Sequence, residues 1–166
     1  MTSLTDQFKV FRVKKFKAGE IILSQGEIPT TAYAIKKGIV KSFNITGDGE
    51  EKPIAFDMEN ELFPVGWAFS KLEHAQYYYG AFTDCELYCV PRESYIEILQ
   101  ANPASLYETL DYFIGRYLNY QMRIDALEQS KASDKLLHTL RFLCLRFGQQ
   151  LRSDVVKIKL PFTQQE

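Results

Sequence analysis

The chain has 166 residues and a formal net charge of −1, but the charge is uneven. Residues 1–130 hold 13 Lys and Arg against 18 Asp and Glu, whereas residues 131–166 hold 7 against 3, so the end of the chain is basic. The apolar content of 46% allows a sizeable core, which excludes a globally disordered chain. No apolar run approaches the ~18 residues of a membrane-spanning helix.

The cysteines and histidines do not have the spacing of a metal site. Cys85 and Cys89 are four residues apart in a strand-like run, and Cys144, His74 and His138 are scattered. We therefore expect no metal and no cofactor, and thiols that fill the core of a cytoplasmic protein. The first residues lack the apolar stretch of a secretory signal, which agrees with that location.

Residues 11–92 have the pattern of short strands separated by turns. Strands are predicted at residues 21–23, 33–35, 39–45, 53–56 and 81–90. The Asp48-Gly49 pair predicts a hairpin turn between the third and fourth of these strands. Short strands at this spacing indicate a β-roll or barrel.

A long helix is predicted from Pro103 to Gln129, after Asn102 as its cap. Its apolar positions are spaced four and three residues apart in strict alternation: Leu106, Leu110, Phe113, Tyr117, Tyr120, Ile124 and Leu127. This heptad pattern is typical of a helix that packs on a partner helix. We predict a parallel homodimer through this stripe, and the alternative is a helix that packs only within its own chain.

The basic end of the chain predicts a second helix and a strand. Ser133 is a candidate N-cap, Gly148 ends the helix, and residues 156–160 alternate as a strand does. Thr163 and Glu166 then have the spacing of a capping box. We interpret this ending as the first turn of a further helix, and hence as a truncated protein.

Four segments carry a resemblance to a known family. They are 16–27 (FKAGEIILSQGE), 33–41 (YAIKKGIVK), 81–87 (AFTDCEL) and 160–166 (LPFTQQE). In this order they resemble the cyclic-AMP-receptor/Fnr (Crp/Fnr) family of bacterial transcription regulators. The resemblance implies an α+β fold: a double-stranded β-roll, the jelly-roll-like fold of cyclic nucleotide-binding domains, followed by a long dimerisation helix and the start of a winged helix-turn-helix.

The resemblance also implies the division of the chain. Residues 1–101 would be the β-roll sensor, 102–130 the dimerisation helix, and 131–166 the incomplete N-terminal part of the DNA-binding domain. DNA would be a partner of the full-length protein, because the recognition helix lies beyond Glu166. For the fragment itself, we interpret its basic residues as a solvated helix face rather than as a DNA-binding surface. No membrane partner is expected.

The family's cyclic-nucleotide cassette is altered in this chain. Members that bind cyclic nucleotides have a Glu after a Gly, which holds the ribose, and an Arg that meets the phosphate. Here Gly66 is kept, Trp67 stands at the Glu position, and no Arg occurs between Arg12 and Arg92. A buried phosphate needs a paired cation, so the sequence disfavours a cyclic nucleotide.

The resemblance assigns an effector pocket to the positions equivalent to this cassette and to two helix residues. They are Gly66, Trp67, Ala68, Phe69, Ala75, Gln76, Tyr77, Tyr120 and Gln121. The aromatic residues among them either fill the core or line a pocket for a less charged small-molecule effector. Tyr120 also belongs to the dimer stripe.

The sequence thus predicts a protein that is not an enzyme: the sensor and dimerisation portion of a transcription regulator, with an unassigned effector. The alternative is a stand-alone effector-binding or dimerisation module without DNA-binding activity. An iron–sulfur sensor would need clustered cysteines, and residues 1–84 have none. A haem sensor would depend on His74 alone, and a cupin-like metalloenzyme would need several inward His or Glu ligands.

Overall fold

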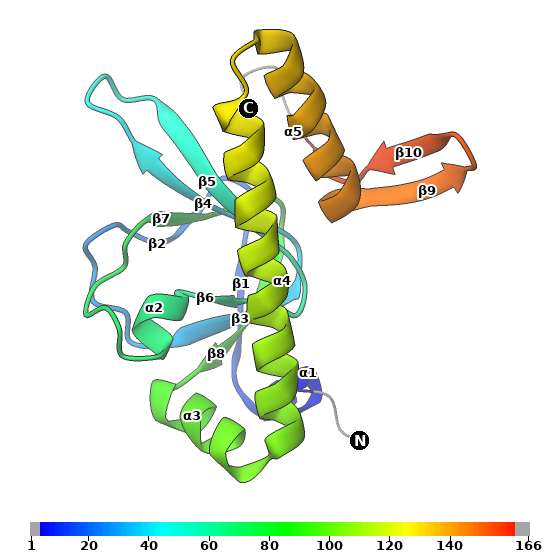
Figure 1. Ribbon diagram of the computed structural model, residues 1–166. Coiled ribbons are helices and arrows are strands. Elements are labelled where there is room, and N and C mark those ends of the chain that lie inside the picture. The colour runs from blue at the N-terminus through cyan, green and yellow to red at the C-terminus, as the bar shows by residue number, and fades with distance from the viewer. Residues whose placement is uncertain (1–3, 162–166) are drawn as a thin grey trace. The chain divides into compact units, whose positions relative to one another are not determined.

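The structure is a computed structural model that describes residues 4–161, in which side-chain burial is described for residues 6–161. It divides into two compact units, residues 1–106 and residues 107–166 (Figure 1). The capping box predicted at Thr163 and Glu166 lies outside the described residues.

The first unit is built on two four-stranded antiparallel sheets. It begins with the short helices α1 (Leu4–Gln7) and η1 (Phe8–Val10). One sheet has the order β1 (Val13–Phe16), β8 (Cys85–Val90), β3 (Ala32–Lys37) and β6 (Leu62–Phe63). The other has the order β2 (Ile21–Leu23), β7 (Tyr78–Ala81), β4 (Val40–Ile45) and β5 (Glu51–Asp57).

Strand β3 is buried on both faces, and this creates two apolar clusters. Tyr33 and Ile35 point to the interior cluster, which joins residues of both sheets. Ala32 and Ala34 alternate with them and point to the outer cluster, on the other face of the β1-β8-β3-β6 sheet. Helices α2 (Val65–Ala68) and α3 (Arg92–Ala101), together with Phe8 of η1, contribute to this outer cluster.

The predicted β-roll is confirmed, and so is the hairpin at Asp48-Gly49, which joins the antiparallel strands β4 and β5. The interpretation of residues 11–92 as strands and turns missed β1, β6, α2 and all of β7 except Ala81, and no helix was predicted over α3. Proline at position 91 is the N-cap of α3, a position where a missing backbone N–H is tolerated.

Gly38, in the tight turn between β3 and β4, has a conformation and surroundings that require glycine. Its φ is +96°, and a Cβ at this position would lie 2.4 Å from the carbonyl oxygen of Asp84 and 2.9 Å from the Sγ of Cys85. The β3–β4 turn therefore packs directly against the start of β8.

The second unit contains most of α4 (Pro103–Glu128), then α5 (Ala132–Phe147) and a hairpin of β9 (Gly148–Arg152) and β10 (Val155–Ile158). The long helix and its successor were predicted with nearly these bounds. The prediction of Ser133 as the N-cap of α5 was wrong: Lys131 holds that position. Nδ1 of His138 lies 3.1 Å from Oδ2 of Asp125, which joins α5 to the last turns of α4.

Among the described helices, none combines the length and the apolarity that crossing a bilayer would need.

Candidate effector site

The interior of the roll is filled by a stack of three aromatic rings. The ring centroids of Tyr33 and Phe63 are 5.4 Å apart, and those of Phe63 and Tyr79 are 5.0 Å apart, with near-parallel planes in both pairs. All three residues are buried, and burial raises the pKa of Tyr33. The three rings fill space between the two sheets, so a ligand could not enter that space without displacing them.

The loop of residues 70–77 is bound to the turn that contains Gly26. The amide of Gly26 donates to the carbonyl of Ala75, and the amide of Ala75 donates to the carbonyl of Glu27, at 2.9 and 2.8 Å. Ala75 is buried in the interior cluster and Tyr77 packs against it. Gln76 is exposed, and its carbonyl accepts a bond from the Gln25 side chain.

The structure divides the candidate pocket residues between the two faces of the β1-β8-β3-β6 sheet. Trp67 and Ala68 belong to the outer cluster, and Phe69 packs against it. Ala75 and Tyr77 belong with the interior cluster. Trp67 therefore packs on the opposite face of this sheet from Ala75 and Tyr77.

The buried charges of the first unit are negative. Among residues 6–161, no Lys, Arg or His side chain is buried, whereas Asp57 and Glu61 are. Oε2 of Glu61 accepts a bond from the amide of Met58 at 2.8 Å. The buried side chains among residues 6–161 therefore offer no Lys, Arg or His to a phosphate, which is costly to bury without a paired cation.

Tyr120 and Gln121 lie in the second unit, and both make hydrogen bonds along α4. The guanidinium of Arg116 donates to the hydroxyl of Tyr112 at 2.7 Å and to that of Tyr120 at 2.6 Å. The Gln121 amide donates to the hydroxyl of Tyr117 at 2.9 Å. Side-chain bonds of four-residue spacing thus link successive turns of this helix.

The predicted dimer stripe is largely exposed. Leu106, Leu110, Tyr117, Ile124 and Leu127 each have between 54% and 60% of their surface accessible. Tyr120 is 39% exposed and Phe113 is half-buried. Most of this row of large apolar side chains on one helix is therefore exposed, as is typical of an interaction surface.

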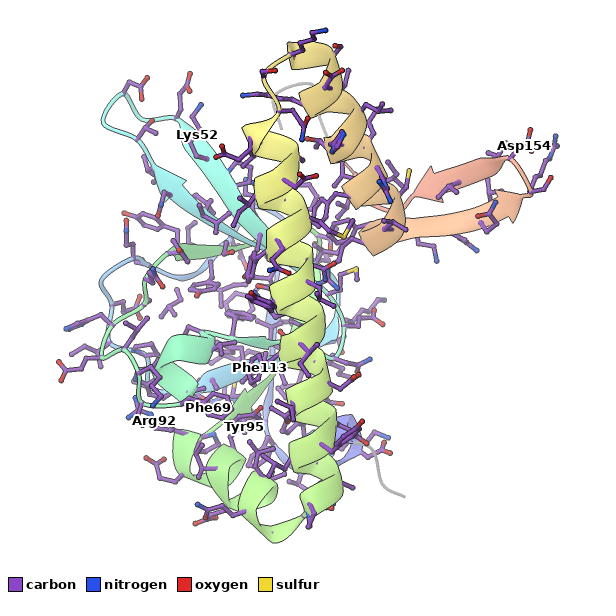
Figure 2. All side chains as sticks on the ribbon, viewed as in Figure 1. Lys52, Phe69, Arg92, Tyr95, Phe113 and Asp154 are labelled. Atoms are coloured by element: carbon purple, nitrogen blue, oxygen red, sulfur yellow. The ribbon has the colours of Figure 1, made fainter. Side chains whose placement is uncertain are left out.

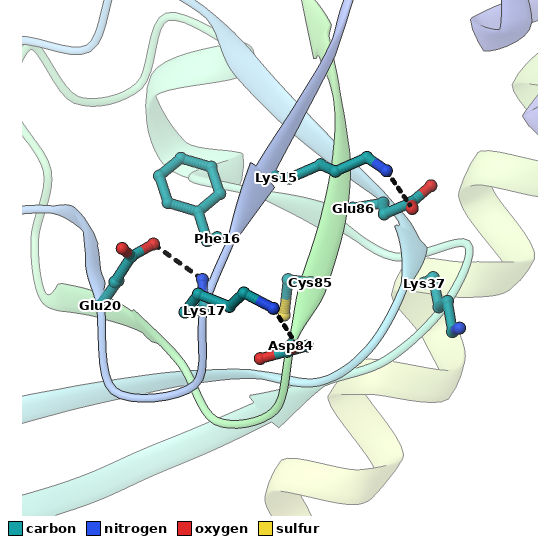
Figure 3. A pocket seen from close by; sticks show the side chains of 8 residues that line it. All are labelled: Lys15, Phe16, Lys17, Glu20, Lys37, Asp84, Cys85 and Glu86. Atoms are coloured by element: carbon teal, nitrogen blue, oxygen red, sulfur yellow. Dashed lines mark hydrogen bonds and ion pairs between the residues drawn. The ribbon is translucent and has the colours of Figure 1, made fainter.

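A surface pocket of about 320 Å³ lies where β1, the β3–β4 turn and the start of β8 meet (Figure 3). Nζ of Lys17 is 2.8 Å from Oδ2 of Asp84, and Nζ of Lys15 is 3.2 Å from Oε1 of Glu86. Hydrogen bonding to Lys17 lowers the pKa of Asp84. Three lysines and three acids line the pocket, so their charges balance. The lining therefore does not favour an ion of either sign.

The thiols have the character of core residues. Cys85 is buried, its Sγ donates to the carbonyls of Ile39 and Thr83, and burial raises its pKa. Cys89 is half-buried, and burial raises its pKa too. Among the residues that the structure describes, His, Cys, Asp and Glu do not gather into groups of three or more that could hold a metal ion.

The comparison with family models matches residues 13–102 to the cyclic nucleotide-binding domain. The chain belongs to the cyclic nucleotide-binding domain family. Within it, the relatives are regulators of the Crp/Fnr type, as the four segments of the sequence predicted. The fold of this family is therefore present in residues 13–102.

Two curated relatives and one solved structure illustrate the similarity. The global nitrogen regulator of Synechococcus elongatus is 28% identical over 138 residues, covering 82% of this chain and 62% of that protein. The fumarate and nitrate reduction regulatory protein of Yersinia pestis is 26% identical, covering 84% and 55%. A CRP/FNR family transcriptional regulator of Thermus thermophilus shares the fold with a TM-score of 0.61 and 21% identity, covering 89% and 73%. The chain spans about three fifths of the length of these curated relatives.

Sequence reasoning missed Phe63, one of the rings that fill the roll, and Arg92, which packs against Trp67 of α2. Phe63 carries no distinctive signal, because isolated aromatics in strand-like runs are common in any core. Arg92 was noted only as the end of an Arg-free segment, yet its Cζ lies 4.0 Å from the ring centroid of Trp67. The signal available was the Pro91-Arg92 start of an amphipathic helix.

Proposed function

We propose that this chain is the sensor and dimerisation portion of a Crp/Fnr-type DNA-binding transcription regulator. The family membership and the regulators among its relatives support this function. DNA binding is proposed for the full-length protein, in which a recognition helix would follow the present segment.

The observation that carries the proposal is the exposed stripe on α4. Leu110 and Ile124 are 54% and 59% exposed, and they stand two heptads apart on a row of regular four- and three-residue steps. Large apolar side chains in this arrangement are stabilised when the same row of a second copy covers them. We propose a parallel homodimer formed through the seven residues of the stripe, from Leu106 to Leu127.

We propose further that the roll is not controlled by a cyclic nucleotide. Three features argue against one: the aromatic stack at Phe63, the outward position of Trp67, and the lack of a buried Lys, Arg or His among residues 6–161. An effector of this roll would be uncharged or weakly charged and would contact Ala75 and Tyr77 on its interior side. It would need to displace at least one ring of the stack.

Light scattering on a size-exclusion column tests the proposed dimer. The wild type should elute as a dimer at micromolar concentration, and Leu110→Asp or Ile124→Asp should convert it to a monomer. Leu145→Asp is the matched control, because Leu145 is 66% exposed on α5 and lies outside the stripe. A wild-type monomer, or an unchanged dimer in both stripe variants, would contradict the proposal.

A further inference from the structure

A single column of side chains runs along the middle of the exposed face of α4. Leu110, Tyr117 and Ile124 follow one another at seven-residue intervals, each with more than half of its surface accessible. On one flank of this column Phe113, which is labelled in Figure 2, is half-buried, and on the other flank Ile114 is 49% exposed. In a parallel pair of helices related by a two-fold axis, such a column lies closest to the axis.

The column is interrupted at its midpoint by a polar group. The Tyr117 hydroxyl accepts a hydrogen bond from Nε2 of Gln121, one turn later on the helix, at 2.9 Å. Both side chains are exposed. Because Gln121 is four residues after Tyr117 and three before Ile124, it lies on the same face of the helix. A second copy that covered Leu110 and Ile124 would therefore also cover this hydroxyl and this amide.

The bond within the helix uses only part of the hydrogen-bonding capacity of the Tyr117–Gln121 pair. A tyrosine hydroxyl can donate as well as accept, and the Oε1 of a glutamine accepts. The hydrogen of the Tyr117 hydroxyl and the Oε1 of Gln121 remain available, because neither has a further partner among the described residues. Burying both at an interface without partners would be costly.

We propose that Tyr117 and Gln121 form a polar layer at the centre of the dimer interface, in which each Tyr117 hydroxyl donates to Oε1 of the partner subunit's Gln121. The two-fold axis makes this bond reciprocal, so the remaining donor of one subunit matches the remaining acceptor of the other. The polar layer rests on the proposed dimer, and it fixes the orientation and the register of the two helices. Gln121 thus belongs to the interface rather than to an effector pocket.

Other pairings of the exposed stripe would leave these polar groups without partners. In an antiparallel pairing centred on Tyr117, the two Gln121 residues would lie about 12 Å apart along the helix axis, on opposite sides of the centre. A parallel pairing shifted by one heptad would set Tyr117 against the partner subunit's Ile124, whose side chain has no polar atom. In coiled coils, a polar position within an apolar stripe selects the register in this way, at a cost in stability.

Sedimentation equilibrium of the whole chain tests whether the polar layer contributes to affinity. Tyr117→Phe removes the hydroxyl and should raise the dissociation constant of the dimer at least about tenfold, because the Gln121 amide is then buried without its partners. Tyr107→Phe is the matched control, since Tyr107 is on the same helix, 70% exposed and outside the polar pair. It should change the constant less than about twofold.

Disulfide trapping tests whether the layer fixes the register. Tyr117→Phe combined with Gln121→Leu leaves no polar group to satisfy, so a dimer should persist at wild-type affinity or tighter, but without a fixed register. Ile124→Cys, added to the wild type, should give an intersubunit disulfide on oxidation, because only the parallel in-register pairing brings the two positions together. Its yield should fall at least about threefold in the double variant. The same proteins without Ile124→Cys show the contribution of the native cysteines.

The outcomes separate the polar layer from the dimer itself. A wild-type monomer would refute the dimer, and the polar layer with it. In a wild-type dimer, an unchanged dissociation constant for Tyr117→Phe would overturn the layer alone, as would an equally large effect of Tyr107→Phe. Equal disulfide yields in the wild type and in the double variant would overturn its role in fixing the register.

Discussion

The rings of Phe63 and Tyr79 stack with their centroids 5.0 Å apart and their planes at 19°. The two residues come from different sheets, β6 and β7, so the stack bridges the interior of the roll. An aromatic pair of this kind adds to the stability of the fold beyond the area it buries. The interior of this sensor thus serves as a core.

Removing one ring of the stack should destabilise the fold strongly. Tyr79→Ala should lower the free energy of unfolding by about 3–5 kcal/mol, the cost of deleting a buried aromatic side chain and leaving a cavity. Urea denaturation followed by circular dichroism measures this change. Tyr107→Ala is the control, because Tyr107 is 70% exposed and should cost less than about 1 kcal/mol. Equal effects in the two variants would show that the stack is not part of the core.

Cyclic nucleotides should not bind to the wild type. Isothermal titration calorimetry with cyclic AMP and with cyclic GMP should give no binding heat, because the described residues offer no buried cation for the phosphate. The same titrations on Tyr79→Ala test whether removing one ring of the stack is enough to let a cyclic nucleotide bind. We expect no binding to this variant either. Sub-micromolar affinity for either nucleotide would refute our interpretation of the cassette.

Gly38→Ala should destabilise the first unit. The positive φ is costly for any residue with a Cβ, and here the added atom meets the backbone of Asp84. We expect a loss of at least about 1–2 kcal/mol in thermal or urea unfolding. Gly47→Ala is the matched control, because a Cβ there meets nothing within 4 Å. The expectation fails if the two variants are equally stable.

Acid should weaken the fold partly through the pocket of Figure 3. Lys17 lowers the pKa of Asp84, and Lys36 with Lys15 lowers that of Glu86. A carboxyl with a lowered folded-state pKa stabilises the fold above its unfolded pKa of about 4, and this contribution is lost as the pH falls through the folded value.

Asp84→Asn should therefore reduce the difference between the urea midpoints at neutral pH and at pH about 3. Glu59→Gln is the control, because Glu59 is exposed and has no ion pair among the described residues. An equal pH dependence in wild type and Asp84→Asn would show that the Lys17–Asp84 ion pair does not contribute to the acid sensitivity of the fold. Because both partners are exposed, salt should diminish the effect.

The parts of the fold that repeat a simple pattern could be predicted from the sequence. The four- and three-residue spacing of the apolar residues from Leu106 to Leu127 predicts α4, and Asp48-Gly49 predicts the hairpin. Both could be predicted because local backbone geometry determines them. Which face of a sheet receives a side chain could not be predicted in the same way. The resemblance predicts a cassette position for Trp67, yet its ring packs in the outer cluster, where Arg92 and α3 offer an apolar and cationic surface. That choice depends on residues 25 positions apart.

Helix α3 shows a second limit. Its ten residues follow a proline and a strand without any polar cap, so the usual signal for a helix start is missing. The helix is stabilised instead by Tyr95 and Leu99, which are buried in the outer cluster. Tertiary packing that the sequence alone does not reveal determines this element.

The bonds from Arg116 to Tyr112 and Tyr120 bear on how two copies would meet. They tie together consecutive turns in the middle of α4, beside the exposed stripe, so that stretch is ordered before any partner arrives. Association then loses less conformational entropy than the folding of a disordered segment onto a partner would. We therefore expect the α4 helices of two subunits to associate as preformed helices. The association rate would then depend on the relative orientation of the subunits rather than on helix formation.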